Sequence, residues 1–272
     1  DGIPSLKGAG FTIVTNSYPH VWPWMFNMAA PNSPVKDVRV RQALNYCFDR
    51  EGLVTLLNGT AEPSVGWLKA NDPNFGNPKN RYGFDPAKGK ALLAEAGFTP
   101  QKPLSFKVMV STSGSGQMLP LPMNEYMQEN LKQSCGVNVE LEAVEWTVLL
   151  TAVRFPPDSP NLKGSMALNV SSPSSDVGIM FRYFSSANFS PNGFNFEQWK
   201  DDEFDAAIAT LAEAKDEATI TASFRKAHER LVDNPPWLYI VHDLNPRAMS
   251  PKVQGFVSAQ SWFADLTLVS MK

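Results

Sequence analysis

The chain has 272 residues, of which 43% are hydrophobic and 19% are charged. This composition is typical of a globular protein with a substantial core and excludes an intrinsically disordered chain. Twenty-four basic residues oppose 27 acidic ones, and no basic block stands out, so nucleic acid is not expected as a partner. No apolar run approaches the roughly 20 residues that a membrane-spanning helix needs. The chain starts at Asp1 without a signal-peptide pattern, and we expect it to be a piece of a longer protein.

The N-terminal third is predicted to contain one extended segment and two helices. Residues 10–27 are rich in β-branched and aromatic residues, which favours strands. Apolar residues at helical spacing predict one helix over 37–58, with Asp37 as its N-cap and an Asn-Gly pair at its end. A second helix over 85–97 has Asp85 as its N-cap and proline in the first helical position.

The middle of the chain alternates between strands and helices. Apolar residues alternate with polar ones over 104–110 and over 137–143, which predicts two strands with a helix over 119–134 between them. A strand, a helix and a strand in this order predict a right-handed crossover with parallel strands. A short helix over 147–154 and a strand over 165–170 follow.

The last third is predicted to be helical before it returns to extended structure. Two helices are expected to begin near Asp201 and near Glu217. A strongly apolar strand over 236–244 follows them, and the tail from 246 onward is extended and rich in turn residues.

Cysteine and histidine usage argues against a metal or cofactor site. Cys47 and Cys135 lie in unrelated helical contexts and form no C-x-x-C motif. We expect two buried free thiols, with a disulfide as the alternative. His20, His228 and His242 are scattered, without an H-E-x-x-H pattern, so no metal and no cofactor are expected.

The stretch "LNVSSPSSDVGIMFRYF", from Leu168 to Phe184, raises the question of function. A serine cluster ends one apolar run, and a second apolar run follows it. Ligands collect beyond the carboxyl ends of parallel strands, so a binding loop is one interpretation. The other is a solvated turn in which Asp176 or a neighbouring serine caps a helix over 177–184. On local grounds the two interpretations are equally open.

An enzyme is the less favoured alternative. A nucleophilic serine needs a base within hydrogen-bond reach and an oxyanion hole. Neither G-x-S-x-G nor S-x-x-K occurs around Ser171–Ser175. We therefore expect a protein that is not an enzyme, with a serine hydrolase that uses the Ser171–Ser175 loop as the alternative.

Several ordered motifs resemble those of one known family. "YGFDPAKGKALLAEAGF" resembles a family helix Y-D-P-x-K-A-K-x-L-L-A-E-A-G, and "GVNVELEAVEW" resembles a family strand that ends in [ED]-W. The pattern V-R-x-A-[LF]-x-x-A-[IM]-D-R is matched by Val40, Arg41, Ala43, Leu44, Asp49 and Arg50. From about Asn27 onward, the chain resembles extracytoplasmic solute-binding proteins of family 5. These are the oligopeptide-, dipeptide- and nickel-binding components of ABC importers.

The resemblance implies an α/β fold, namely a lobe of a type II, cluster C periplasmic binding protein with a central mixed sheet flanked by helices. We expect residues 1–30 to cross from a missing N-terminal lobe and residues 31–236 to form the second ligand-binding lobe. Residues 237–272 would be the return strand and the tail toward the first lobe. The implied function is capture of a small solute between two lobes and delivery to a membrane permease. The protein would be periplasmic or otherwise extracytoplasmic, and monomeric.

The resemblance also gives the serine loop a role. Peptide-binding relatives carry G-W-x-x-D here, and their aspartate pairs with the peptide ammonium. Asn169 stands where the tryptophan would be and Ser172 where the aspartate would be, so the peptide anchor is missing. A serine cannot neutralise a buried ammonium, which favours an opine-like, sugar-acid-like or phosphate-like solute over a peptide-like one. The expected ligand-binding residues are Asn169, Ser171, Ser172, Ser174, Ser175, Asp176 and Arg182.

Overall fold

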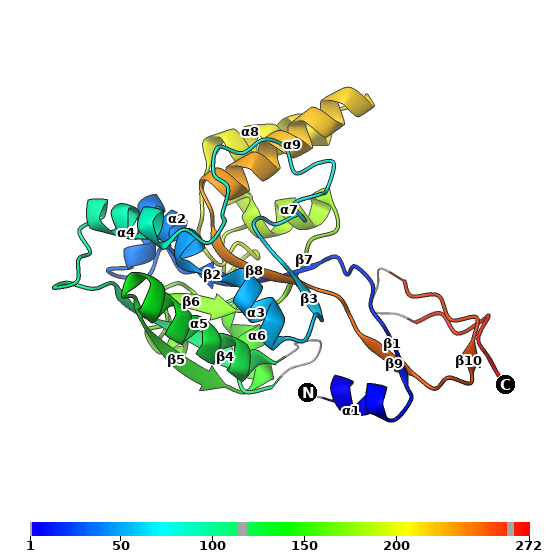
Figure 1. The fold of residues 1–272 in the computed structure, drawn as a ribbon. Helices are drawn as coiled ribbons and strands as arrows, with labels where there is room; N and C mark the ends of the chain where they lie inside the picture. Colours follow the sequence, from blue (N-terminus) through cyan, green and yellow to red (C-terminus); the bar gives the residue numbers. More distant parts are fainter. Residues whose placement is uncertain (1, 114–118, 260–263) are drawn as a thin grey trace.

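The computed structural model describes residues 2–113, 119–259 and 264–272 (Figure 1). Its α-helices are α1 (Ile3–Gly8), α2 (Val38–Cys47), α3 (Arg50–Leu56), α4 (Pro86–Glu95), α5 (Pro120–Cys135), α6 (Trp146–Ala152), α7 (Val177–Phe184), α8 (Asp202–Glu213) and α9 (Glu217–Asp233). Its strands are β1 (Thr12–Val14), β2 (His20–Phe26), β3 (Ala61–Pro63), β4 (Ser105–Ser111), β5 (Asn138–Val144), β6 (Ala167–Asn169), β7 (Ser172–Pro173), β8 (Trp237–Asp243), β9 (Arg247–Met249), β10 (Val253–Gln254) and β11 (Ser270–Met271).

A mixed sheet forms the centre of the molecule, as the sequence predicts. The strand order is β3-β8-β2-β6-β4-β5, and the short strand β7 also pairs with β2. The β4, β5 and β6 strands are parallel to one another, whereas β2 is antiparallel to β6, β7 and β8. The sheet therefore contains β2 and β8, which belong to the two segments expected to cross between lobes.

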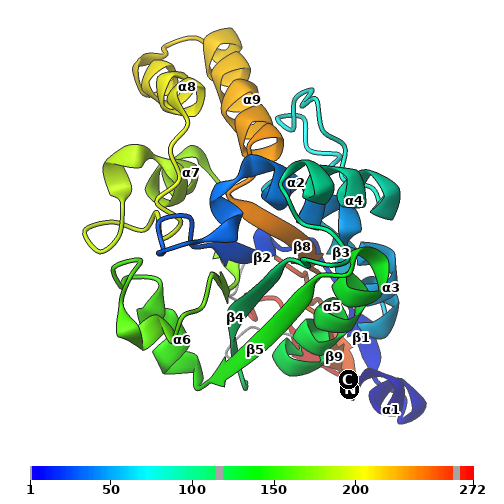
Figure 2. The same cartoon turned by 90° about the vertical axis from the view of Figure 1, so that its left-hand side faces the viewer.

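Helices cover both faces of this sheet. Figure 2 shows α2, α3, α4 and α5 on one face, and α6 and α7 on the other. The α8 and α9 helices pack against each other and project from one end of the molecule (Figures 1 and 2). None of the described helices combines the length and the apolar character that crossing a bilayer requires.

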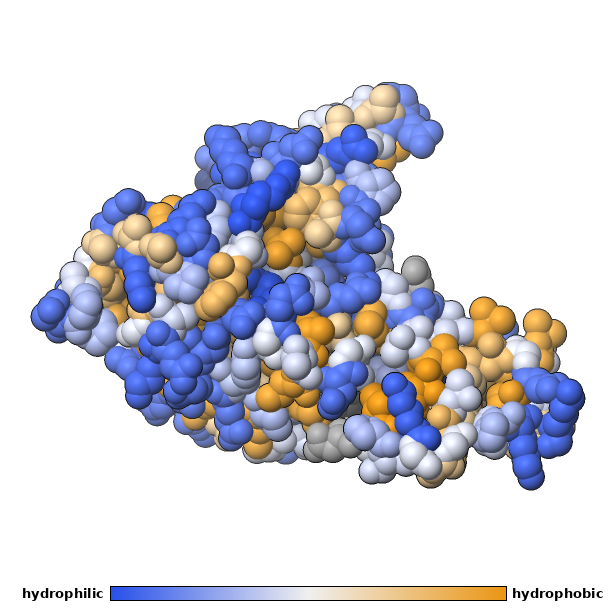
Figure 3. Space-filling model, in the orientation of Figure 1, coloured by the Kyte–Doolittle hydropathy of each residue, from blue (hydrophilic) through white to orange (hydrophobic). Residues whose placement is uncertain are grey.

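The two chain ends form an arm that extends away from the main sheet (Figure 1). In this arm β1 pairs with β9, and β10 pairs with β11. The face seen in Figure 3 carries several hydrophobic patches along the arm. Large apolar side chains are exposed there, namely those of Phe11, Val257, Leu266, Leu268 and Met271. Exposed apolar surface of this kind marks a place where another part of a protein packs.

Local sequence signals predicted several helix starts correctly. Asp37 and Asp85 accept hydrogen bonds from backbone N–H groups of α2 and α4, at 2.9 Å in each case. The α5 helix ends at Gly136, whose φ of 70° is left-handed and suits a residue without a side chain. The β4 and β5 strands pair in parallel and are connected through α5, as the sequence predicts.

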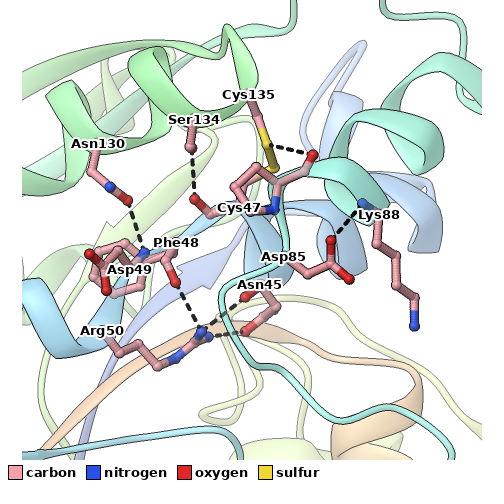
Figure 4. The surroundings of a disulfide bond; sticks show 11 residues. Asn45, Cys47, Phe48, Asp49, Arg50, Asp85, Lys88, Asn130, Ser134 and Cys135 are labelled. Atoms are coloured by element: carbon pink, nitrogen blue, oxygen red, sulfur yellow. Dashed lines mark hydrogen bonds between the residues drawn. A yellow bond between two sulfur atoms is a disulfide. The ribbon is translucent and has the colours of Figure 1, made fainter.

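The prediction of one helix over 37–58 is wrong, because the helix breaks after Cys47. Phe48 is extended, and Asp49 starts α3 by accepting a hydrogen bond from Gly52 N at 3.1 Å. Helix α5 satisfies the backbone groups freed at the break. Ser134 Oγ donates to Cys47 O at 2.7 Å, and Asp49 N donates to Asn130 Oδ1 at 2.9 Å (Figure 4).

The prediction of two free thiols is also wrong, because Cys47 and Cys135 form a disulfide (Figure 4). Their α-carbons lie 5.9 Å apart, although 88 positions separate them in the sequence. The C-terminal ends of α2 and α5 bring them together. Neither helix pattern contains information about the other, so the sequence could not predict this pairing.

Arg41 and Arg50, from the motif that resembles the family, have a structural role. Arg50 is fully buried, and its guanidinium donates to the carbonyl oxygens of Asn45 and Ser64 and to Asn45 Oδ1, at 2.5–3.0 Å. Burial lowers the pKa of Arg50 to about 9 and that of Arg41 to about 10. Arg41 donates to the carbonyl oxygens of Pro235 and Val35. The motif therefore joins α2 and α3 to β8 and the loops beside it.

Candidate functional site

The serine loop lies at one edge of the main sheet. Strands β4, β6 and β8 all run toward this edge, because β4 is parallel to β6 and both β6 and β8 are antiparallel to β2. The chain also enters β2 and leaves β8 here. The loop after β6 therefore lies beside the two segments that connect the sheet to the arm, where ligands of open α/β sheets collect.

Asn169 points into the core behind the loop. Its side chain is 1% exposed, accepts a hydrogen bond from Asn124 Nδ2 at 2.7 Å and donates to Pro23 O at 2.9 Å. Asn124 Oδ1 in turn accepts from the indole of Trp24 at 2.7 Å. This buried network fixes the end of β6. A ligand contact by Asn169 stays a prediction.

Ser172 is buried within the short strand β7. It pairs with Val21 of β2, and its hydroxyl donates to Pro173 O at 3.3 Å. The half-buried Tyr183 of α7 lies beside Ser172. Burial raises the pKa of the Tyr183 hydroxyl, so this group is a neutral hydrogen-bonding partner at ordinary pH. Ser172 thereby connects β2 to α7.

The rest of the loop lies nearer the surface, and Ser171 is half-buried. Asp176 Oδ1 accepts from Ile179 N at 3.1 Å, so Asp176 caps α7 as predicted. Ser175 Oγ donates to the other carboxylate oxygen at 2.8 Å. Ser174 N donates to Pro19 O at 2.8 Å, which anchors the loop to the segment before β2.

Ser174 and Ser175 line a hollow of about 470 Å³. Its other walls come from the segment before β2 and from the loop after Trp67; they are Ser17, Tyr18, Pro19, Leu68, Lys69, Asn71, Asp72 and Pro73. Lys69 is paired with Glu62 at 2.5 Å, and Asp72 Oδ1 accepts a hydrogen bond from Asn74 N at 2.7 Å. The loop therefore brings two hydroxyl groups to this hollow, of which that of Ser175 already donates to Asp176.

Arg182 lies on helix α7, and its guanidinium group and that of Arg154 both lie against the ring of Phe194. The guanidinium of Arg182 lies 3.7 Å from the centre of the Phe194 ring, and that of Arg154 lies 4.8 Å from it. Both arginines are exposed, and neither has a carboxylate within salt-bridge distance among the residues that the structure describes. Tyr183 packs against the same ring at 5.9 Å between centres. Two like charges thus lie against one aromatic ring.

The structure therefore divides the expected residues into two groups. Ser174, Ser175 and Asp176 lie together at the surface, whereas Asn169 and Ser172 lie beneath them. A chain of contacts from Ser172 through Tyr183 and Phe194 leads to Arg154 and Arg182. Sequence reasoning missed Phe194, since nothing in an isolated "NGFNF" indicates which cations will stack on it.

Comparison with known families identifies the chain. A model of the bacterial extracellular solute-binding proteins, family 5 (middle part), matches residues 2–202. The chain belongs to this family. Family 5 proteins are solute-binding proteins, which agrees with a site built from a loop and a hollow rather than from a nucleophile and a base.

Several curated relatives of this family 5 chain are named for peptides. The periplasmic oligopeptide-binding protein OppA of Escherichia coli is 26% identical over 250 residues, which are 88% of this chain and 42% of OppA. Di/tripeptide-binding protein 2 of Pseudomonas aeruginosa is 24% identical over 226 residues, which are 83% of this chain and 41% of that protein. The chain thus spans less than half the length of these relatives.

Solved structures share the fold. HbpA2 from Haemophilus parasuis superposes with a TM-score of 0.78 at 24% identity, over all of this chain and 52% of HbpA2. The oligopeptide-binding protein AppA of Bacillus subtilis, in complex with a nonapeptide, gives a TM-score of 0.79 at 21% identity, over all of this chain and 54% of AppA. The fold is that of a type II periplasmic binding protein, in agreement with the sequence prediction.

Proposed function

We propose that this chain is the second lobe of the substrate-binding component of an ABC importer. Residues 1–30 and 237–272 would carry the connections to a first lobe, and residues 31–236 would supply this lobe's half of the ligand site. The observation that carries the proposal is the pairing of the serine loop with the segment before β2. That pairing supports a loop beside the proposed connections to the first lobe, which is where we propose that the cleft between the lobes lies.

The exposed apolar residues of the arm support a partner lobe. Their exposed fractions reach 77% at Leu268 and 73% at Val257, which is costly for apolar side chains in water. A first lobe packed around β1 and β9 would cover them. Closure of the two lobes would then bury the ligand and present it to the permease.

The arginines set the charge preference of the site in this proposal. An anion beside Arg154 and Arg182 would be favourable, because no described carboxylate pairs with either guanidinium group. A carboxylate or phosphate of the ligand would supply that charge, and the hydroxyl of Ser174 would bind a neighbouring ligand oxygen. We therefore propose an acidic or hydroxylated solute, of opine-like, sugar-acid-like or phosphate-like chemistry, in preference to an unmodified peptide.

The location follows from the disulfide and the family. A disulfide forms and persists outside the cytoplasm, so Cys47–Cys135 supports a periplasmic or extracytoplasmic setting. We propose that the protein works there as a monomer, with the membrane permease as its protein partner. Nucleic acid has no part in this function.

Ligand carried through purification tests the proposal. The full-length protein, including the segment that precedes residue 1, would be analysed by native mass spectrometry and then titrated with the ligand so identified. Arg182→Gln and Arg154→Gln should each weaken binding of an anionic ligand by roughly fivefold or more, since a charge pair in such a site contributes about 1 kcal/mol to several kcal/mol. Arg81→Gln, at an exposed arginine away from the loop, is the matched control.

Two outcomes would contradict the proposal. Tight binding of unmodified di- or tripeptides that is lost in Asp176→Ala would make Asp176 the ammonium anchor and refute the anion preference. Stoichiometric labelling of a serine in Ser171–Ser175 by a fluorophosphonate would favour the hydrolase and refute the binding function.

A further inference from the structure

The Cys47–Cys135 disulfide lies directly against Gly89 of α4. A β-carbon placed on Gly89 would overlap Cys47 Sγ and would stand 3.2 Å from Cys135 Sγ. Gly89 is buried in the middle of the helix, where glycine is unfavourable relative to alanine. The glycine is therefore explained by the space that the two sulfur atoms occupy between α2, α4 and α5.

The two cysteines differ in exposure. Cys47 is 0% exposed, whereas Cys135 is half-buried. Cys135 lines a groove of about 700 Å³ between α4, α5 and the loop before β4, and Cys47 does not. The groove has an apolar floor that includes Leu93, Phe98 and Leu104, and the exposed Lys90 and Lys132 at its rim.

We propose that this groove is a thiol–disulfide exchange site at which a thiolate reagent attacks Cys135. The observations favour a reagent with an anionic sulfur, because Lys90 and Lys132 form no salt bridge with any described residue and stand beside the approach. Cys47 is 0% exposed among the described residues, and α4 covers it at Gly89.

The complete exchange is a two-electron reduction of the Cys47–Cys135 disulfide by thiols. The reagent's thiolate forms a new S–S bond with Cys135 Sγ, and the Cys47 sulfur leaves as a thiolate that takes a proton from water. A second thiol then attacks the reagent's sulfur in this mixed disulfide and releases Cys135. The reagent, a dithiol or two monothiols, ends as a disulfide.

Reduction removes the close packing of the sulfur atoms against α4 without separating α5 from α2. Two thiol sulfurs need a van der Waals separation well beyond a covalent bond, and the space against Gly89 is already filled. The Cys135 thiol must therefore turn into the groove, or α4 must move outward. The hydrogen bonds from Ser134 and to Asn130 still join α5 to the α2–α3 break (Figure 4).

Native exchange with glutathione tests the direction of attack. The folded protein is treated with glutathione, quenched with acid, and mapped by mass spectrometry without reduction. We expect the mixed disulfide on Cys135 to exceed that on Cys47 by at least about tenfold. Ala94→Trp, in the groove wall, should slow the exchange several-fold, whereas Ala87→Trp, at an exposed alanine of α4 outside the groove, should not. Adducts mainly on Cys47, or equal rates in the two tryptophan variants, would overturn the proposal.

A glycine substitution tests the packing independently. Gly89→Ala should lower the melting temperature of the oxidised protein, and should lower it less in the Cys47→Ala, Cys135→Ser background, where no sulfur opposes the new methyl group but the contact with Ala43 O at 3.2 Å remains. Gly8→Ala, at a helical glycine with open space around it, should show no such difference between backgrounds. Hydrogen exchange of α4 amides should rise on reduction while α8 and α9 stay unchanged. Equal effects of Gly89→Ala in both backgrounds would contradict the role assigned to this residue.

Discussion

Glu197 should make the stability of this lobe fall as the pH rises. Its side chain is fully buried, its Oε1 accepts a hydrogen bond from the Trp237 indole, and its Oε2 has no hydrogen-bond partner in the described residues. Burial raises the pKa of this carboxyl from 4.5 to about 8. Between these two values the folded protein holds a proton that the unfolded chain has lost.

The sign and size of the effect follow from this difference in bound protons. The stabilising contribution is fully present below pH 4.5 and is lost as the pH rises through about 8. At 1.36 kcal/mol per pKa unit, Glu197 alone would lower the free energy of unfolding by about 3 kcal/mol between pH 4 and pH 7, as an upper limit. Glutamine has the shape of the protonated acid and does not titrate.

Urea unfolding across this pH range is the assay. The free energy of unfolding of Glu197→Gln should rise steadily relative to that of the wild-type protein from pH 4.5 to pH 8. The difference between the two free energies at each pH isolates the contribution of this single carboxyl from those of all other titrating groups. Glu213→Gln, at an exposed glutamate of α8, should give a flat difference. A flat difference for Glu197→Gln as well would show that the buried carboxyl is ionised in the folded protein and would refute the reasoning.

Three further changes probe the rest of the lobe. Burial lowers the pKa of His228 to about 4, and its Nε2 accepts a hydrogen bond from Leu68 N at 3.0 Å. The free energy of unfolding, measured in urea, should therefore fall as the pH drops from 6.5 toward 4, and should fall less in His228→Gln. Asn124→Leu should cost about 1–3 kcal/mol in thermal unfolding, because it leaves the buried indole of Trp24 without an acceptor. Reducing the disulfide should lower the free energy of unfolding by about 2–5 kcal/mol, since it spans 88 positions; urea unfolding with and without reductant measures this, and an unchanged midpoint would refute it.

Local chemistry explains which parts of the fold the sequence predicted. Asp37, Asp85 and Asp176 are recognisable because a short acidic side chain before an apolar helical pattern has one common role, which is to cap the helix. The parallel β4–β5 pair follows from the order of alternating and helical patterns, with a glycine at 136 to end the helix between them. Each of these signals lies within a few residues of the feature that it predicts.

The errors and omissions depend on contacts between distant segments. The break after Cys47 is stabilised by Asn130 and Ser134, which lie more than 80 positions away. The disulfide depends on the same approach of α5 to α2. At the site, Arg182 is among the residues that the sequence predicts, but Arg154 and Phe194, whose ring lies against both guanidinium groups, belong to other segments. Periodicity or spacing within one segment cannot predict a contact between segments that are distant in the sequence.

A calorimetric comparison tests the central claim, that this chain is one half of an enclosing site. The ligand identified from the full-length protein would be titrated into that protein and into the 272-residue chain under the same conditions. We predict one-to-one binding by the full-length protein and weak or undetectable binding by the chain alone, because desolvation of the ligand needs both lobes. Submicromolar, one-to-one binding by the isolated chain would contradict the claim.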